Sequence, residues 1–118
     1  RDFTYVDDIA EGTVRVLDRD IEQRYKIYNI GNHEPVELMD FIGATEGELG
    51  IEAKKEFLPM QPGDVVATFA DVDELRRDVG YEPKTPLRVG LRQWVAWYRH
   101  FALGEPATVG PTVEPVQA

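Results

Sequence analysis

Two short segments contain residue types that bind nucleotides. Arg1 precedes the aromatic and β-branched stretch 3–6, and a guanidinium can bind a diphosphate through two parallel hydrogen bonds. Farther along the chain, Gln61 and Asp64 enclose a Pro-Gly turn. A carboxylate there could accept hydrogen bonds from ribose hydroxyls, and the glutamine amide could bond a neighbouring polar group. Each segment also has a plain structural explanation, a surface charge for Arg1 and an ordinary type I or II turn for the loop.

Nucleophilic and metal chemistry have few residues to work with. The chain contains no Cys and no Ser, so its two histidines lack the partner that a catalytic base activates. His33 lies in a polar turn, where a solvent-exposed side chain is the favoured interpretation. Glu34 and Glu37 beside it make a weak candidate metal site. His100 lies near the end of a predicted helix, where the helix dipole favours a cation. No metal is expected.

A glycine-rich segment, 43–50, has the spacing G-x-x-x-G-x-x-G. A dinucleotide fingerprint must follow a strand and open a helix, because the amides of that turn bind the pyrophosphate. These glycines instead fall inside and at the end of a helical stripe, and Glu46 and Glu48 would repel phosphate. The segment is therefore interpreted as a helix with weak positions. The acidic pairs are interpreted as helix N-caps: Asp7 with Asp8, and Asp71 with Asp73.

Length and charge restrict the function classes. A chain of 118 residues is one small domain or a piece of a larger one. It has 13 Lys and Arg against 22 Asp and Glu, and the net charge of −9 argues against non-specific nucleic-acid binding. No apolar run approaches the roughly 20 residues of a membrane-spanning helix. No signal peptide is apparent, and the lack of Cys suits a reducing cytoplasm, so a cytoplasmic location is expected.

The elements that would position these residues alternate between strands and helices. Strands are predicted at 3–6, 24–30 and 52–58, with a short extended stretch at 66–69. Helices are predicted at 8–18, at 38–49, between an Asp71 cap and Gly80, and at 86–102. This order predicts an α/β fold with about four helices, but the strands are too few for a complete doubly wound sheet. Residues 103–118 have no apolar period and are predicted to be a disordered tail.

Several of these segments together resemble one family. Residues 1–9 resemble the R-D-[FY]-x-[YH]-V-x-D-[IVL] segment of the extended short-chain dehydrogenases/reductases, and 28–31 is similar to their Y-N-[IL]-G strand. Residues 57–65 resemble the family's P-G-D loop, and 80–91 its last two helices. The resemblance covers about residues 1–101 in family order. It implies a partial Rossmann-type fold in which residues 1–102 are the carboxy-terminal, substrate-binding portion.

Within this family of nucleotide-sugar epimerases and dehydratases, the M-Q-P-G-D loop and the final W-V-A-W-Y-R are most similar to UDP-glucuronate 4-epimerases. The resemblance implies that Arg1 binds the diphosphate of a UDP-sugar and that Asp64 binds its ribose. Gln61 stands where most relatives have an Arg on the diphosphate. Phe3 stands where many have a Tyr near the ribose. These four residues are the predicted substrate-binding set.

The resemblance also implies a reaction. In the family, tightly held NAD⁺ takes a hydride from C4 of the sugar, and the Tyr of a Y-x-x-x-K motif takes the hydroxyl proton. The hydride then returns to the other face of the 4-keto sugar. This chain has no Tyr followed four residues later by Lys, and no Gly-rich turn after an initial strand. It is expected to carry no catalytic residue and to bind no NAD itself, although the parent enzyme would use NAD.

Alternatives to the epimerase portion are a non-catalytic binding or structural module and part of a related nucleotide-sugar dehydratase. The expected partner is a UDP-sugar, with no nucleic acid and no membrane. The apolar faces of the helices at 38–49 and 86–102 would be partly exposed in this chain. Exposed apolar faces of that kind favour self-association, which is therefore also expected.

Overall fold

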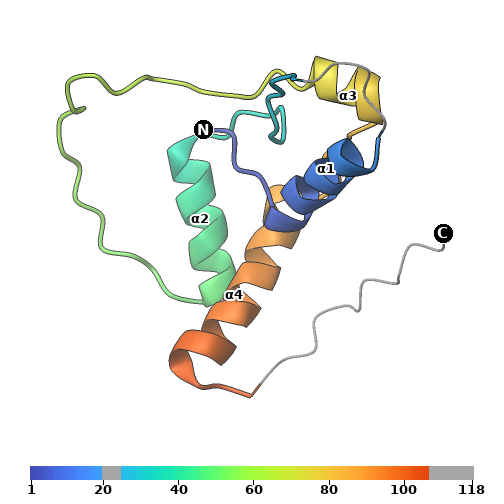
Figure 1. The fold of residues 1–118 in the computed structure, drawn as a ribbon. Helices are drawn as coiled ribbons and strands as arrows, with labels where there is room; N and C mark the ends of the chain where they lie inside the picture. The colour runs from blue at the N-terminus through green and yellow to red at the C-terminus, as the bar shows by residue number, and fades with distance from the viewer. Residues whose placement is uncertain (20–24, 107–118) are drawn as a thin grey trace.

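The computed structural model describes residues 1–19 and 25–106. These residues form four helices, which are labelled in Figure 1: α1 (Val6–Asp18), α2 (Leu38–Leu49), α3 (Asp73–Val79) and α4 (Leu87–Leu103). Helix α2 packs along α4, and α1 packs on α3. A long loop leaves the end of α2, runs in a wide arc away from the helices, and returns at α3 (Figure 1). None of these helices is long and apolar enough to cross a membrane.

The helices lie where the sequence predicts them, within two residues at each end. Two predicted stops are confirmed, because Gly50 and Gly80 take positive φ angles of 71° and 65° and end α2 and α3. A left-handed residue at this position lets the chain leave the helix, and glycine adopts it without strain. The predicted N-cap of α3 is wrong, because Val72 is the N-cap residue, it makes no side-chain cap, and Asp73 is the first residue of the helix. Asp71 accepts from the amide of Asp73, at 3.1 Å, and not from that of Glu74.

The starts of α1 and α4 are also different from the prediction. Tyr5 is the N-cap residue of α1, so Asp7 and Asp8 lie in the first turn, where their charge still favours the helix dipole. Pro86 is the N-cap residue of α4, and Thr85 makes no side-chain cap. The amide of Thr85 instead donates to the buried carboxylate of Asp8 at 3.0 Å. This hydrogen bond joins the beginnings of the two helices.

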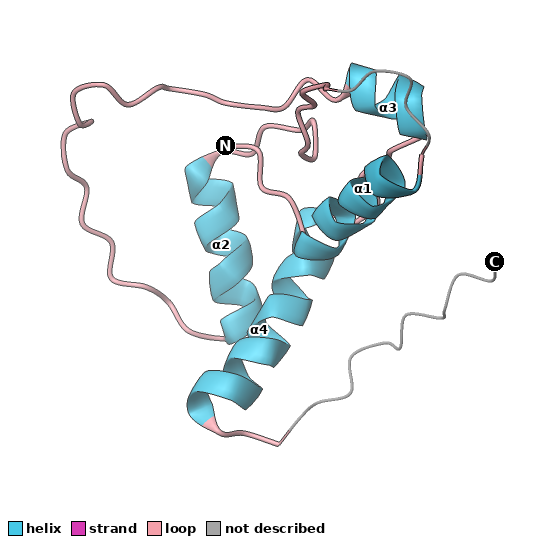
Figure 2. Ribbon diagram, viewed as in Figure 1, coloured by secondary structure: helices cyan, strands magenta, loops and turns pink. Residues whose placement is uncertain are grey.

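The predicted strands do not form in the described residues. The segments 3–5, 25–30, 52–58 and 66–69 are extended or irregular, and Figure 2 shows them as loop. Residue 24 of one predicted strand lies outside the described residues. A strand needs the amide and carbonyl groups of a neighbouring strand. Among the described residues, the only such pairing is one antiparallel bridge between Asp2 and Pro35.

The core is small. The largest fully buried side chains of residues 1–19 and 25–106 are those of Val72, Leu75 and Tyr81. Partly buried apolar side chains pack around them: Val16, Tyr28, Ile30, Ala70 and Val79. Burial raises the pKa of Tyr81 to about 12. The predicted exposure of the apolar helix faces is confirmed, since Leu38 of α2 is 61% exposed and Phe101 of α4 is 74% exposed.

A glycine on α1 makes this core possible. A Cβ atom at Gly12 would lie 2.6 Å from Ile30 Cδ1 and 2.8 Å from Tyr81 Cδ2. Atoms that close overlap, so Gly12 allows α1 to approach the buried tyrosine ring. A Cβ at Gly43 of α2 would meet nothing within 4 Å.

The two glycines therefore predict opposite effects of the same substitution. Gly12→Ala is expected to lower the free energy of unfolding by about 1–2 kcal/mol, because overpacking outweighs the gain in helix propensity. Gly43→Ala is expected to raise it by up to about 1 kcal/mol, because alanine adds propensity and the site is open. Urea unfolding of both variants measures the difference. Equal shifts in the same direction would contradict this account of Gly12.

Candidate functional site

Arg1 and Asp64 lie side by side although 63 residues separate them. Arg1 Nη2 is 2.5 Å from Asp64 Oδ1, and Arg1 Nη1 donates to the carbonyl oxygen of Val65. The Arg1 side chain is 39% exposed and that of Asp64 is 51% exposed. The structure thus brings together a cation and a carboxylate from the two segments that the sequence singled out, and leaves both open to solvent.

A turn presents Asp64 to Arg1. The amide of Asp64 donates to the carbonyl of Gln61 at 3.1 Å, and Gly63 takes a φ of 89°. A positive φ at the third residue of such a turn is typical of type II, one of the two types predicted. Asp64 Oδ1 also accepts from the amide of Val65 at 2.8 Å. Gln61 is therefore in the same turn as Asp64, and its backbone helps to fix the direction of the carboxylate.

Asp2 fixes the segment that carries Arg1. Its carboxylate accepts three backbone hydrogen bonds, from Asn32 at 3.0 Å, His33 at 3.1 Å and Ala70 at 2.8 Å. A Cβ atom at Gly31 would lie 2.7 Å from Asp2 Oδ2. Only a glycine at this position therefore allows the turn at 31–33 to lie so close to the Asp2 carboxylate. The carboxylate thereby joins the first residues, the turn at 31–33 and the segment before α3.

The backbone of Arg1 is held as well. The Val36 amide donates to the Arg1 carbonyl at 2.9 Å, and the Arg1 nitrogen donates to the Val36 carbonyl at 2.8 Å. The sequence alone does not indicate this role of Asp2. It stands within the R-D-F motif, but its partners lie 30 to 68 residues away, and no local pattern indicates them.

His33 has a structural role here. Its backbone φ is 58°, which is uncommon for a residue with a Cβ atom. Its Nδ1 lies 2.7 Å from the carbonyl oxygen of Ala70, and its ring packs edge-on against Phe69. Within residues 1–19 and 25–106, no three His, Asp or Glu side chains are grouped as a metal ion would require. His33 with Glu34 and Glu37 therefore makes no metal site there.

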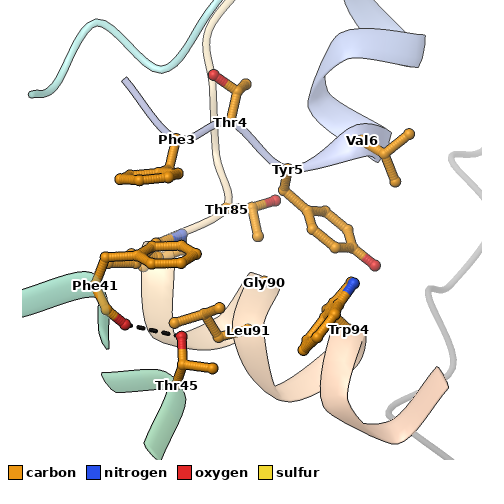
Figure 3. A pocket seen from close by; sticks show the side chains of 12 residues that line it. Phe3, Thr4, Tyr5, Val6, Phe41, Thr45, Thr85, Gly90, Leu91 and Trp94 are labelled. Atoms are coloured by element: carbon orange, nitrogen blue, oxygen red, sulfur yellow. Dashed lines mark hydrogen bonds between the residues drawn. The ribbon is translucent and has the colours of Figure 1, made fainter. Parts of the chain in front are cut away.

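Phe3 lies in a separate apolar cavity. Figure 3 shows its ring over that of Phe41, with centroids 3.9 Å apart and planes 14° from parallel. The cavity has a volume of about 430 Å³ and lies between the first residues, α2 and α4. Its other lining residues are Thr4, Tyr5, Val6, Thr45, Thr85, Pro86, Leu87, Gly90, Leu91 and Trp94. Phe3 thus extends into this cavity, while Arg1 contacts the loop at 61–65.

Two polar side chains of the cavity lining have protein partners. The Tyr5 hydroxyl donates to Gln93 Oε1 at 2.8 Å, and Thr45 Oγ1 donates to the Phe41 carbonyl at 2.8 Å. Partial burial raises the pKa of Tyr5, and the nearby charges of Asp7 and Asp8 raise it further. A phenol with a raised pKa stays protonated near neutral pH, and this one already donates its proton in a hydrogen bond. The cavity therefore offers apolar contact and no acid–base pair.

The glycine-rich segment does not fit a dinucleotide. Gly43 and Gly47 lie within α2, and Gly50 ends the helix. The interpretation of this segment as a helix with weak positions is thus confirmed. A pyrophosphate cradle needs amides free at the start of a helix, whereas the helix takes up those of Gly43 and Gly47. These glycines therefore do not fit NAD, and no reaction step is assigned to them.

The chain is similar to known proteins over most of its length. No family model matches it. A 37.6 kDa protein of Escherichia coli O111:H- is 47% identical over 117 residues, covering 86% of this chain. Protein CapI of Staphylococcus aureus is 41% identical over 117 residues, with the same coverage. UDP-glucuronate 4-epimerase 6 of Arabidopsis thaliana is 40% identical over 110 residues, covering 83% of this chain and 24% of that protein.

Two solved structures that are similar to this chain are also of UDP-sugar epimerases. The UDP-glucuronic acid 4-epimerase of Bacillus cereus, in complex with UDP-glucuronic acid and NAD, superposes on 77% of this chain with a TM-score of 0.71 and 36% identity. The UDP-glucose 4-epimerase of Bifidobacterium longum, in complex with NAD⁺ and UDP, superposes on 89% with a TM-score of 0.79 and 25% identity.

These neighbours confirm the predicted fold class, a partial α/β fold of the Rossmann type, even though the described residues form only helices and loops. The chain spans about a third of the length of the curated relatives that it matches first, 35% for each of the first two.

Proposed function

Because this chain is homologous to the carboxy-terminal portion of NAD-dependent UDP-sugar epimerases of the extended short-chain dehydrogenase/reductase family, we propose that it binds the nucleotide of a UDP-sugar. The proposed substrate is UDP-glucuronate. Support comes from the five UDP-glucuronate 4-epimerases of Arabidopsis thaliana among its relatives, which are 34–40% identical to it. The whole enzyme would invert C4 of the sugar through a transient 4-keto intermediate.

The observation that carries this proposal is the proximity of Arg1 and Asp64. A nucleoside diphosphate places negative phosphates next to a ribose with free hydroxyls. A protein that binds both parts needs a cation for the phosphates and a hydrogen-bond acceptor for the ribose within the reach of one nucleotide. Arg1 and Asp64 provide this pair, and both side chains are solvent-accessible. Among the described residues, no other predicted site residues form such a pair of a cation and a hydrogen-bond acceptor.

Each predicted residue has a defined part in the proposal. Arg1 binds the diphosphate, because its planar guanidinium can donate two parallel hydrogen bonds to phosphate oxygens. Asp64 accepts from a ribose hydroxyl. Gln61 places its amide beside the same turn, with weaker hydrogen bonds than an arginine would make at that position. Phe3 lines the neighbouring cavity and adds apolar contact.

The proposal assigns no catalytic residue to this chain. NAD would supply the hydride acceptor in the whole enzyme, and a Y-x-x-x-K motif, absent from this sequence, would move the proton. What the chain contributes is orientation, since a nucleotide held at its diphosphate and ribose fixes the position of the attached sugar. A substitution that weakens nucleotide binding at these residues would therefore slow the reaction of the whole enzyme, although it removes no group that reacts with the sugar.

Arg1→Ala is expected to weaken UDP binding by about 1.5–3 kcal/mol, or roughly 10- to 100-fold, the range for hydrogen bonds to charged groups. The measurement is a two-dimensional amide NMR titration of this chain with UDP and with UDP-glucuronate. Arg88→Ala is the matched control, because Arg88 is an exposed arginine in α4 and its removal changes the net charge equally. Equal losses of affinity in the two variants would contradict the assignment of Arg1.

A further inference from the structure

The loop between α2 and α3 is attached to the rest of the chain at few points. We call residues 51–69 the strap. All of its residues are exposed except Lys55, which is intermediate. At its beginning, the Ala53 amide and Lys55 Nζ donate to Glu46 Oε1 of α2, at 2.7 and 2.5 Å. At its end, Phe69 packs against His33. The strap runs between these points in the wide arc of Figure 1.

Arg1 provides the attachment in between. Among the described residues, only Arg1 makes hydrogen bonds that join residues 56–68 to another part of the chain. Both of its terminal nitrogens are engaged, Nη2 with Asp64 and Nη1 with the Val65 carbonyl. A diphosphate that binds the same edge of the guanidinium would need these two nitrogens. At that edge, the acceptors of the strap and the phosphate oxygens would compete for the same N–H donors.

The competition favours the phosphates. An ion pair as exposed as this one contributes little, equivalent to a factor of about five or less in an equilibrium constant. A diphosphate carries several charged oxygens and can engage both nitrogens with full charge, whereas the Val65 carbonyl is a neutral acceptor. Asp64, once released, has a free carboxylate beside the site where the ribose would lie.

We propose that the contact of Arg1 with Asp64 and Val65 is a latch, released when an anionic diphosphate binds Arg1. This inference rests on the proposed function. In the resting state Asp64 occupies Arg1 and holds the strap. In the bound state the guanidinium contacts phosphate, Asp64 turns to the ribose hydroxyls where a ribose is present, and residues 56–68 lose their direct contact with Arg1. Asp64 thus has two roles in succession, as an internal competitor and then as a ligand.

Inorganic pyrophosphate tests the latch, because it has the phosphates without the ribose. Calorimetry on this chain would compare Asp64→Asn with Glu56→Gln, which removes the same charge from the same strap. Asp64→Asn is expected to bind pyrophosphate three- to fivefold more tightly than Glu56→Gln, since only the first removes the competitor. Equal affinities of the two variants would overturn the latch and leave the proposed function standing. Binding that Arg1→Ala does not weaken would overturn both.

Backbone order provides a second readout. In the unliganded chain, ¹⁵N relaxation of residues 63–66 is expected to give lower order parameters in Asp64→Asn than in Glu56→Gln, approaching the value of about 0.6 below which a backbone is flexible. Saturating pyrophosphate is expected to lower them in the wild-type chain and to change them little in Asp64→Asn. Order parameters that stay constant in all of these samples would also overturn the latch.

Discussion

Replacing Asp2 by alanine is expected to lower the free energy of unfolding by about 3 kcal/mol. The carboxylate accepts backbone hydrogen bonds from Asn32, His33 and Ala70. Each hydrogen bond to a charged group contributes about 1.5–3 kcal/mol, and the three act as a unit, so the loss is less than their sum. Urea unfolding measures it.

Two controls separate the hydrogen bonds of Asp2 from its charge. Asp2→Asn keeps one oxygen acceptor and should lose only part of the stability. Asp7→Ala removes an exposed carboxylate nearby and should change stability by less than about 0.5 kcal/mol. If Asp2→Ala were no worse than Asp7→Ala, the three hydrogen bonds would not stabilise the fold.

Tyr81→Ala is expected to be the most damaging single substitution, at about 3–5 kcal/mol. The side chain is 1% exposed and fills the small core against α1, so its removal leaves a cavity. Because so few side chains of the described residues are fully buried, a loss of this size is a large fraction of the total stability. The measurement is the midpoint and slope of a denaturant transition.

Tyr81→Phe separates packing from hydrogen bonding. The hydroxyl of Tyr81 donates to the Gly31 carbonyl at 2.9 Å, and phenylalanine would leave that carbonyl without this donor. The expected cost is about 1–2 kcal/mol. Tyr25→Ala is the comparison, because that ring is 79% exposed and its loss should be within about 0.5 kcal/mol of zero. A Phe variant as unstable as the Ala variant would contradict the packing account.

The helices could be predicted from the sequence because their signals are local. Apolar residues at helical spacing and the stops at Gly50 and Gly80 lie within each segment, and the structure has these helices within two residues. The caps were less predictable. The sequence indicates only that Asp8 lies at the start of a helix. In the structure its carboxylate accepts a hydrogen bond from the amide of Thr85, 77 residues away.

The presence of strands could not be predicted from the local sequence alone. The composition of 25–30 favours an extended backbone, but a strand also needs pairing with another segment, and residues 25–30 form no regular element. The site has the same limitation. Arg1 and Asp64 were chosen by residue type and by resemblance, whereas their contact with each other became visible only in three dimensions. Their roles toward a UDP-sugar stay predictions until binding is measured, as does self-association through the exposed helix faces.

The hydrogen bonds that residues 2–8 make to distant parts of the chain also have a consequence for folding kinetics. Asp2 contacts Ala70, Asp8 contacts Thr85 and Tyr5 contacts Gln93, with separations of 68, 77 and 88 residues. Contacts between distant residues close large loops, and chains dominated by such contacts fold slowly. During synthesis, the first segment must wait until residue 93 has left the ribosome. The contact of this segment with α4 can therefore form only after α4 has been synthesised.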